Sequence, residues 1–207
     1  MSQVFPTKSN LIAAKKSLAL AKLGYDLMDK KRTVLIREMM ALIDRAGDVQ
    51  SRIDGTYARA YRALQRANIS LGGCEEYAHT VPIDDGLSIS ARSVMGVELP
   101  TVTLESGEFT LHYGLGSTNS QLDEACLQFA EVKKLTAELA EAESSVYRLA
   151  AAIKKTQKRA NALRNILIPK FEGTIRFISA ALEEKEREDF GRLKVIKAQN
   201  NTRMQDA

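Results

Sequence analysis

Apolar residues recur at alternating steps of three and four through the first third of the chain. Counted from Leu11 to Thr56, twelve of the 14 positions are apolar, and the exceptions are Arg32 and Thr56. A 3.5-residue period over six heptads predicts a coiled-coil seam rather than an ordinary amphipathic helix. The main seam residues expected in this arm are Leu11, Leu18, Tyr25, Leu35, Leu42, Val49 and Ile53.

Beyond Ile53 the larger apolar residues are Tyr57, Tyr61 and Leu64, each displaced from the heptad. This shift predicts a stutter that locally relaxes the supercoil. Gly24, Gly47 and Gly55 lower the helix propensity by about 1 kcal/mol each relative to Ala, so bends or tight crossings are expected there.

A second arm repeats the pattern from Val132 to Leu167. Its expected seam residues are Leu139, Val146, Leu149, Ile153 and Leu163. Ser117, Thr118 or Asn119 can cap the start of this helix. Pro169 is expected to kink or interrupt the helix, because proline costs about 3 kcal/mol in a helix interior, and an apolar stripe resumes beyond it.

The segment between the arms changes period. From Leu87 to Leu99 the odd positions are apolar except Ser93, which predicts a strand with one buried face. Residues 102–104 and 109–113 flank a turn-forming stretch at 105–108 and predict a small β-hairpin.

The fold expected from these patterns is mainly α, a long antiparallel two-helix coiled coil with a small β-hairpin region at the bend. At about 1.5 Å per residue, the arms would make a rod on the order of 100 Å long. The expected parts are an N-terminal helix over 7–71, a Gly/Pro-rich bend over 72–116, a C-terminal helix over 117–200, and flexible termini at 1–6 and 201–207.

The net charge of +4 conceals a separation along the chain. Residues 1–69 carry 13 Lys/Arg against 6 Asp/Glu, and residues 146–207 carry 14 against 7. Residues 70–145 carry 3 against 13. A chain that folds back at its middle would therefore have a basic terminal end and an acidic bend.

Composition narrows the class of protein. The 207 residues are 44% hydrophobic and 27% charged, too apolar for a disordered chain, and only 6% are aromatic. No apolar run reaches the roughly 18 residues of a membrane span, and the first residues lack the features of a signal peptide. Cys74 and Cys126 form no CxxC pair, so a cytosolic, reduced chain with buried, unlinked cysteines is expected.

No catalytic or cofactor constellation is recognisable in the sequence. The glycines at 114 and 116 lack the lysine and spacing of a phosphate loop and suit a helix entry instead. The only histidines, His79 and His112, have no metal-ligand spacing. An enzyme acting alone is therefore the least favoured class, and no catalytic, cofactor-binding or metal residues are expected.

Basic runs at 30–32 and 154–159 raise the alternative of nucleic-acid binding. They lie on long helices among apolar seam positions, where solvated faces or protein contacts are the default, and few aromatics are present to stack on bases. A basic helical nucleic-acid binder and a structural coiled-coil scaffold or tether stay open as alternatives at this point.

Two stretches are more specific than a generic coiled coil. One runs over residues 6–32 and includes Gly24-Tyr25-Asp26-Leu27-Met28. The other runs over 159–197 and includes Arg159-Ala160-Asn161-Ala162-Leu163 and Ile166-Leu167-Ile168-Pro169. Together they resemble the D-subunit family of V-type (vacuolar/archaeal-type) rotary ATPases, over almost the whole chain.

The resemblance implies a non-catalytic central-stalk rotor that couples ATP hydrolysis or synthesis to ion translocation. The implied partners are the hexamer of catalytic A and B subunits, a small F subunit, and a cup-shaped subunit that links to the membrane ring. The implied location is cytoplasmic and peripheral to the membrane, without direct insertion. On this basis the expected hexamer contacts are Lys8, Lys15, Lys16, Lys22, Lys194 and Lys197.

Overall fold

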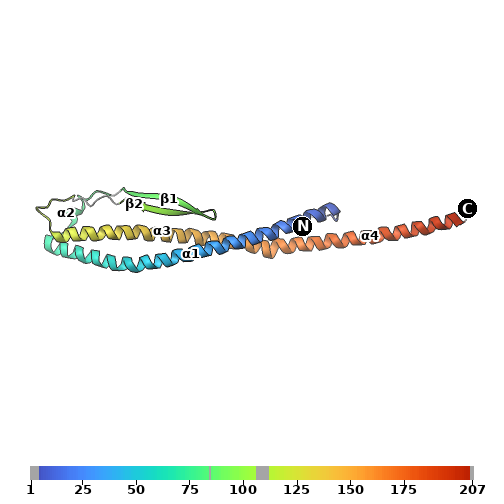
Figure 1. Cartoon of the computed structure of the whole chain (residues 1–207), viewed down its shortest axis with the longest axis horizontal. Coiled ribbons are helices and arrows are strands. Elements are labelled where there is room, and N and C mark those ends of the chain that lie inside the picture. Colours follow the sequence, from blue (N-terminus) through green and yellow to red (C-terminus); the bar gives the residue numbers. More distant parts are fainter. Residues whose placement is uncertain (1–4, 84, 106–111, 206–207) are drawn as a thin grey trace. The chain divides into compact units, whose positions relative to one another are not determined.

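The computed structural model describes residues 5–83, 85–105 and 112–205, with side chains as far as residue 198. Its elements are two long helical arms and a β-hairpin, which comes between them in the sequence and lies alongside α3 (Figure 1). The first arm is α1 (Lys8–Leu71), followed by the short α2 (Glu75–Ala78) and by β1 (Leu87–Val94) and β2 (Val97–Leu104). The second arm contains α3 (Ser120–Ala162), the π-helical segment η1 (Leu163–Leu167) and α4 (Ile168–Gln205). The predicted fold class is confirmed.

The chain divides into two compact units, and each is described by itself. The terminal unit contains the described residues of 1–31 and 155–207, and the central unit contains those of 32–154. The predicted flexible termini fall partly on residues 1–4 and 206–207, which lie outside the described residues. Helix α4 extends to Gln205, beyond the boundary at residue 200 expected from the sequence.

Local polar groups mark where the long helices begin and end. The amide of Asn10 donates to Thr7 Oγ1 at 3.2 Å, which satisfies a free N–H in the first turn of α1. The amide of Leu122 donates to Asn119 Oδ1 at 3.2 Å and caps α3 in the same way. Gly72 ends α1 at φ 77°, a conformation that glycine adopts without a Cβ penalty.

The two arms are antiparallel within each unit. In the central unit, Arg45 pairs with Glu138, Arg59 with Glu131, and Ser70 with Gln121, so residue numbers rise on α1 as they fall on α3. In the terminal unit, Lys8 pairs with Glu186 and Lys22 with Glu172, also in descending order.

The heptad of α1 continues without the predicted stutter. Beyond Ile53 the buried positions are Thr56, Ala60, Ala63 and Ala67, which keep the three-four alternation. The prediction was wrong because it followed side-chain size, whereas the small side chains of Thr56 and of the alanines occupy the buried positions. Tyr57, Tyr61 and Leu64 lie beside the seam, and Tyr61 is 54% exposed.

The glycines of α1 are not close crossings. A Cβ at Gly47 or Gly55 would meet no atom within 4 Å, and one at Gly24 would lie 3.8 Å from Leu163 Cδ1, an ordinary contact. The expectation of tight packing at Gly47 and Gly55 was therefore wrong.

Segment η1 displaces the seam of the second arm by one residue. Leu163 is half-buried, but Leu167, the next predicted seam residue, is 38% exposed, and Ile168 takes the inward position. From Ile168 the heptad resumes through Phe171, Ile175 and the fully buried Ile178. The helix is thus not ended before Pro169. A π-turn inserts one residue instead, as single-turn π-bulges do within α-helices.

The hairpin turns earlier in the chain than predicted. Residues 87–99 do not form one strand, because Met95 (φ 50°) and Gly96 (φ 74°) make a two-residue turn that pairs β1 with β2, Val94 opposite Val97 and Leu87 opposite Leu104. The apolar alternation continued through this turn and concealed it. Residues 106–111, in which most of the predicted turn and second strand lie, are outside the described residues, and Tyr113 is in no strand.

The core of the central unit lies where the tip of the hairpin packs on the paired arms. Leu99 of β2, Leu35 and Leu42 of α1, and Leu149 of α3 form one buried cluster, and Val94 and Val97 pack against it. Support from the helices explains why a two-stranded sheet, marginal by itself in water, is ordered here.

Candidate protein-contact surfaces

The twelve expected seam residues differ in burial, and none of them is exposed. Leu35, Leu42, Val49, Ile53 and Leu149 are buried. The remaining seven, half-buried, are Leu11, Leu18, Tyr25, Leu139, Val146, Ile153 and Leu163. A fully buried leucine or isoleucine contributes about 1.5–3 kcal/mol relative to an exposed one, so the five buried residues stabilise the packing of the central unit.

Cross-arm ion pairs accompany the seam. Arg45 Nη2 lies 2.8 Å from Glu138 Oε1, and 4.0 Å separates Arg45 Nη1 from Glu141 Oε1. The hydrogen bond to Glu138 raises the pKa of the Arg45 guanidinium above its ordinary value. These half-exposed pairs contribute at most about 1 kcal/mol each, so they fix register more than they stabilise.

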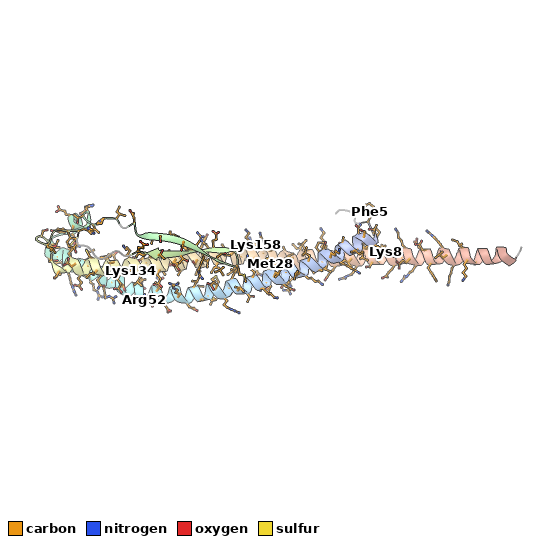
Figure 2. All side chains as sticks on the ribbon, turned by 45° about the horizontal axis from the view of Figure 1, so that its top comes forward. Phe5, Lys8, Met28, Arg52, Lys134 and Lys158 are labelled. Carbon is orange, nitrogen blue, oxygen red and sulfur yellow. The ribbon has the colours of Figure 1, made fainter. Side chains whose placement is uncertain are left out.

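The six lysines expected at a partner interface fall in the terminal unit and differ in their surroundings. Lys8 Nζ lies 3.1 Å from Glu186 Oε1 and Lys22 Nζ lies 3.1 Å from Glu172 Oε1 (Figure 2 labels Lys8). Lys194 Nζ lies 5.5 Å from the centroid of the Phe190 ring. Lys15, Lys16 and Lys197 are exposed. The structure thus pairs two of the six lysines with carboxylates of the opposite arm.

The terminal unit also carries exposed apolar residues that the sequence analysis did not select. Leu20, Leu23 and Leu27 are 71%, 56% and 54% exposed and share one face of α1. On α4, Phe177, Phe190 and Leu193 are 59%, 64% and 64% exposed. The sequence contained a sign of the α1 group, because Leu20, Leu23 and Leu27 follow a second three-four spacing outside the seam. Exposed apolar residues that share one helix face, as Leu20, Leu23 and Leu27 do, are candidates for protein contacts.

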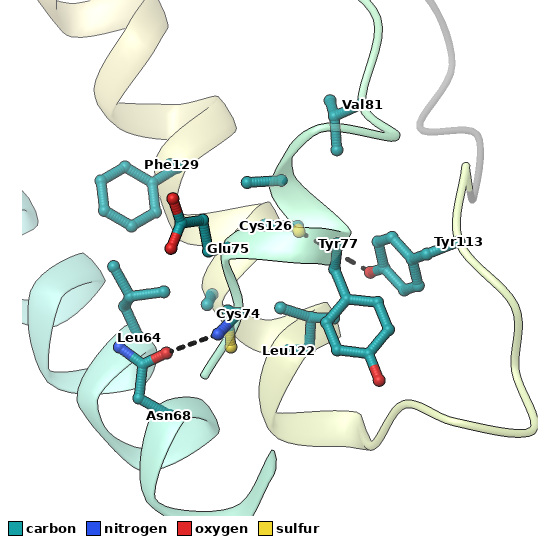
Figure 3. A pocket seen from close by; sticks show the side chains of 12 residues that line it. Leu64, Asn68, Cys74, Glu75, Tyr77, Val81, Tyr113, Leu122, Cys126 and Phe129 are labelled. Carbon is teal, nitrogen blue, oxygen red and sulfur yellow. Dashed lines mark hydrogen bonds between the residues drawn. The ribbon is translucent and has the colours of Figure 1, made fainter. Parts of the chain in front are cut away.

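The end of the central unit near α2 has an open, mainly apolar pocket of about 510 Å³ (Figure 3). Its lining includes Leu64, Leu122 and Phe129. The amide of Cys74 donates to Asn68 Oδ1 at 3.0 Å, so the chain leaving α1 is held against that helix.

Tyr113 connects the returning chain to α3 at this pocket. Its hydroxyl donates to Asp123 Oδ1 at 2.8 Å and lies 3.7 Å from Cys126 Sγ (Figure 3 shows the contact with Cys126). Burial raises the pKa of the Tyr113 phenol, and the hydrogen bond to Asp123 adds to this. Burial, with the neighbouring Cys126, also raises the pKa of the Cys74 thiol. Both cysteines are free thiols.

Among residues 5–83, 85–105 and 112–205, no group of three or more His, Cys, Asp or Glu side chains is arranged to hold a metal ion. Over the same residues, no helix combines the length and apolar character needed to cross a membrane.

The antiparallel arms and the β-hairpin that packs on them define a coiled-coil hairpin protein. Its outer surface carries lysines and exposed apolar residues, which are candidates for contacts with other proteins. Residues 10–198 match the family model of the ATP synthase D subunit. The chain belongs to this family, as the resemblance found in the sequence predicted.

Curated relatives agree over nearly their whole length. The V-type ATP synthase D subunit of Thermotoga neapolitana is 47% identical over 94% of this chain and 97% of its own. The A-type ATP synthase D subunit of Methanosphaera stadtmanae is 36% identical, with 93% and 92% covered. That of Thermococcus kodakarensis is 36% identical, with 94% of each chain covered.

Proposed function

We propose that the chain is the central-stalk rotor of a V/A-type rotary ATPase and couples ATP hydrolysis or synthesis in a catalytic hexamer to ion translocation across the membrane. The observation that carries the proposal is the family match over residues 10–198, in a chain whose arms pair antiparallel in both units.

The rotor makes and breaks no covalent bond itself in this proposal. It acts through differential contacts: an asymmetric surface that turns inside the hexamer favours a different conformation of each catalytic site in turn. The seam supports this role, because arms held by buried leucines resist sliding and separation when torque is applied.

The partners are those that the family resemblance implies, and the distribution of charge and of apolar surface supports where each of them binds. The terminal unit meets the A and B subunits through its lysines and through exposed apolar residues such as Leu20, Leu23 and Leu27. The acidic segment 70–145 faces the cup-shaped subunit that links to the membrane ring, and the small F subunit binds an exposed stretch of the coiled coil near the bend. The chain is then cytoplasmic and peripheral to the membrane.

Gentle native purification of the tagged full-length chain, followed by intact-complex mass spectrometry and an ATPase assay, tests the proposal. The expected result is recovery with two larger nucleotide-binding subunits and one small subunit, with ATPase activity in the complex. Recovery as a lone dimer would favour the coiled-coil scaffold instead, and salt-sensitive recovery with nucleic acid would favour the nucleic-acid binder. Either outcome would overturn the rotor proposal.

A further inference from the structure

The hairpin register determines which backbone groups point away from the ladder. The amide of Glu105 donates to the carbonyl of Gly86 at 3.0 Å, so these two residues form a hydrogen-bonded pair. In an antiparallel ladder such pairs alternate with non-bonded ones, and Leu87↔Leu104 and Ile89↔Val102 are therefore non-bonded. On β1, the N–H and C=O groups of Leu87, Ile89, Ala91 and Ser93 consequently point outward.

The outer edge of β2 is closed by its surroundings. Pro100 has no N–H to offer. The outward amide of Val102 donates to Glu141 Oε2 at 2.8 Å, and the carbonyl of Glu98 accepts from Arg148 Nη1 at 3.1 Å. Side chains of α3 thus occupy the place that a third strand would take beside β2.

The outer edge of β1 has none of these protections. Within the described part of the chain, no group bonds to the outward backbone of Leu87, Ile89, Ala91 or Ser93, and these residues are exposed. The strand contains no proline, and its single charged residue, Arg92, is bonded to Glu38 Oε1 at 3.0 Å. Soluble proteins ordinarily block such edges with charges, prolines or bulges, so an open one is a template for another strand.

Apolar surface adjoins the open edge. Leu87 and Ile89 are 50% and 69% exposed, and they line a groove of about 720 Å³ between the hairpin and the helices, together with Tyr57, Phe129 and Val132. A strand added beside β1 would bring alternate side chains to this same apolar side of the sheet.

We propose that an extended segment of another protein of the ATPase assembly adds to the hairpin as a third strand along β1. Its chemistry is set by the site: apolar at alternate residues toward the groove, and basic in net charge, because residues 70–145 carry 13 acidic against 3 basic residues. A second copy of this chain would bring two such acidic segments together, which opposes pairing. The inference rests on the proposed function only in requiring an assembly.

Hydrogen–deuterium exchange, resolved to single amides, tests strand addition on the full chain alone and in the purified native assembly. The outward amides of Leu87, Ile89, Ala91 and Ser93 are expected to exchange about tenfold or more slowly in the assembly. The ladder amides of Ser88 and Ser90 serve as an internal control, because they are bonded to β2 in both samples. Equal rates for the outward amides would overturn the inference and leave the rotor proposal intact.

A matched pair of variants checks the backbone contribution. Ala91→Pro removes one outward N–H at a position where an edge strand tolerates proline, whereas Ala91→Thr keeps it. The first is expected to weaken the protection of neighbouring outward amides about threefold to tenfold, and the second to leave it unchanged. Equal effects of the two variants would contradict backbone pairing.

Protection in the isolated chain that rises with its concentration would show a second copy as the occupant and would overturn the assignment to another protein of the assembly.

Discussion

Leu149 has no exposed surface and lies in the cluster of Leu35, Leu42 and Leu99, so it joins both arms to the hairpin. An aspartate there would be a buried charge without a partner, which costs several kcal/mol or forces the arms apart. Leu149→Asp is therefore expected to lower the free energy of unfolding by more than about 3 kcal/mol in denaturant titrations, and Leu42→Asp to act similarly.

Tyr147 provides the control, two residues away on the same helix but 79% exposed. Tyr147→Asp is expected to change the stability by less than about 0.5 kcal/mol. Equal stability of Leu149→Asp and Tyr147→Asp would contradict a seam that joins the arms.

Tyr113 and Cys74 predict a loss of stability in alkali. Their ordinary pKa values are 10.0 and 9.0, and burial raises both in the folded chain. Above about pH 9 the unfolded chain therefore releases these protons while the folded chain retains them, so the free energy of unfolding falls as pH rises. Below pH 9 this contribution is fully present.

Replacing the phenol isolates its share of the effect. Tyr113→Phe is expected to flatten the decline above pH 10, by less than the roughly 1.4 kcal/mol per pH unit of one fully retained proton. Denaturant titrations at a series of pH values measure the profiles of the variant and of the unmodified chain. A profile in Tyr113→Phe as steep as that of the unmodified chain would exclude Tyr113 as the source.

At the scale of the element, η1 reconciles two apolar stripes that are out of phase. The seam ends its first run at Leu163 and begins its second at Ile168, five residues later. The α-helical spacing would be three or four residues, so one extra residue is accommodated by the π-turn. The sequence contained a sign of this extra residue. The steps from Leu163 to Leu167 and from Leu167 to Phe171 are both four residues, whereas a heptad alternates steps of three and four.

Deleting one residue should remove the need for the π-turn. In a Pro169→Ala background, which allows a regular α-helix, deletion of Leu167 is expected to leave the unfolding midpoint equal or higher, because the two stripes then follow one heptad. Deletion of Tyr147 in the same background should strongly destabilise the chain, because it turns Leu149 and Ile153 away from the seam. Similar losses from the two deletions, measured by thermal unfolding, would contradict this account of η1.

For the whole molecule, the separation of charge along the chain leads to a prediction about docking. Lys15→Glu with Lys16→Glu, combined with Lys194→Glu and Lys197→Glu, is expected to weaken association with the catalytic hexamer roughly tenfold at low salt, and less at high salt. Lys133→Glu with Lys134→Glu reverses two neighbouring lysines of α3, matches the Lys15→Glu and Lys16→Glu pair alone, and should leave the affinity unchanged. Association unaffected by the four reversals would remove electrostatics from the docking proposal while leaving the rotor proposal in place.

The sequence by itself determined the two helical arms, their long heptads and the family. These depend on repetition, because an apolar residue every three or four positions over many turns predicts a long helix with one apolar stripe, and Asn119, one of three candidate caps, acts through a contact three residues away. Contacts between residues a few positions apart and long hydrophobic periods can be recognised from the sequence without the fold.

Only the tertiary structure decided the features that depend on residues far away in the sequence but packed nearby in the fold. Alanines at 60, 63 and 67 continue the three-four alternation, but only the structure shows that they are buried in place of the larger Tyr57, Tyr61 and Leu64. The turn at Met95–Gly96 preserves the apolar alternation through it, so period alone could not locate it. The edge of β2 is closed by Glu141 and Arg148, which are more than 35 residues away along the chain. The edge of β1 is open because, among the described residues, no comparable side chain bonds to its outward backbone groups.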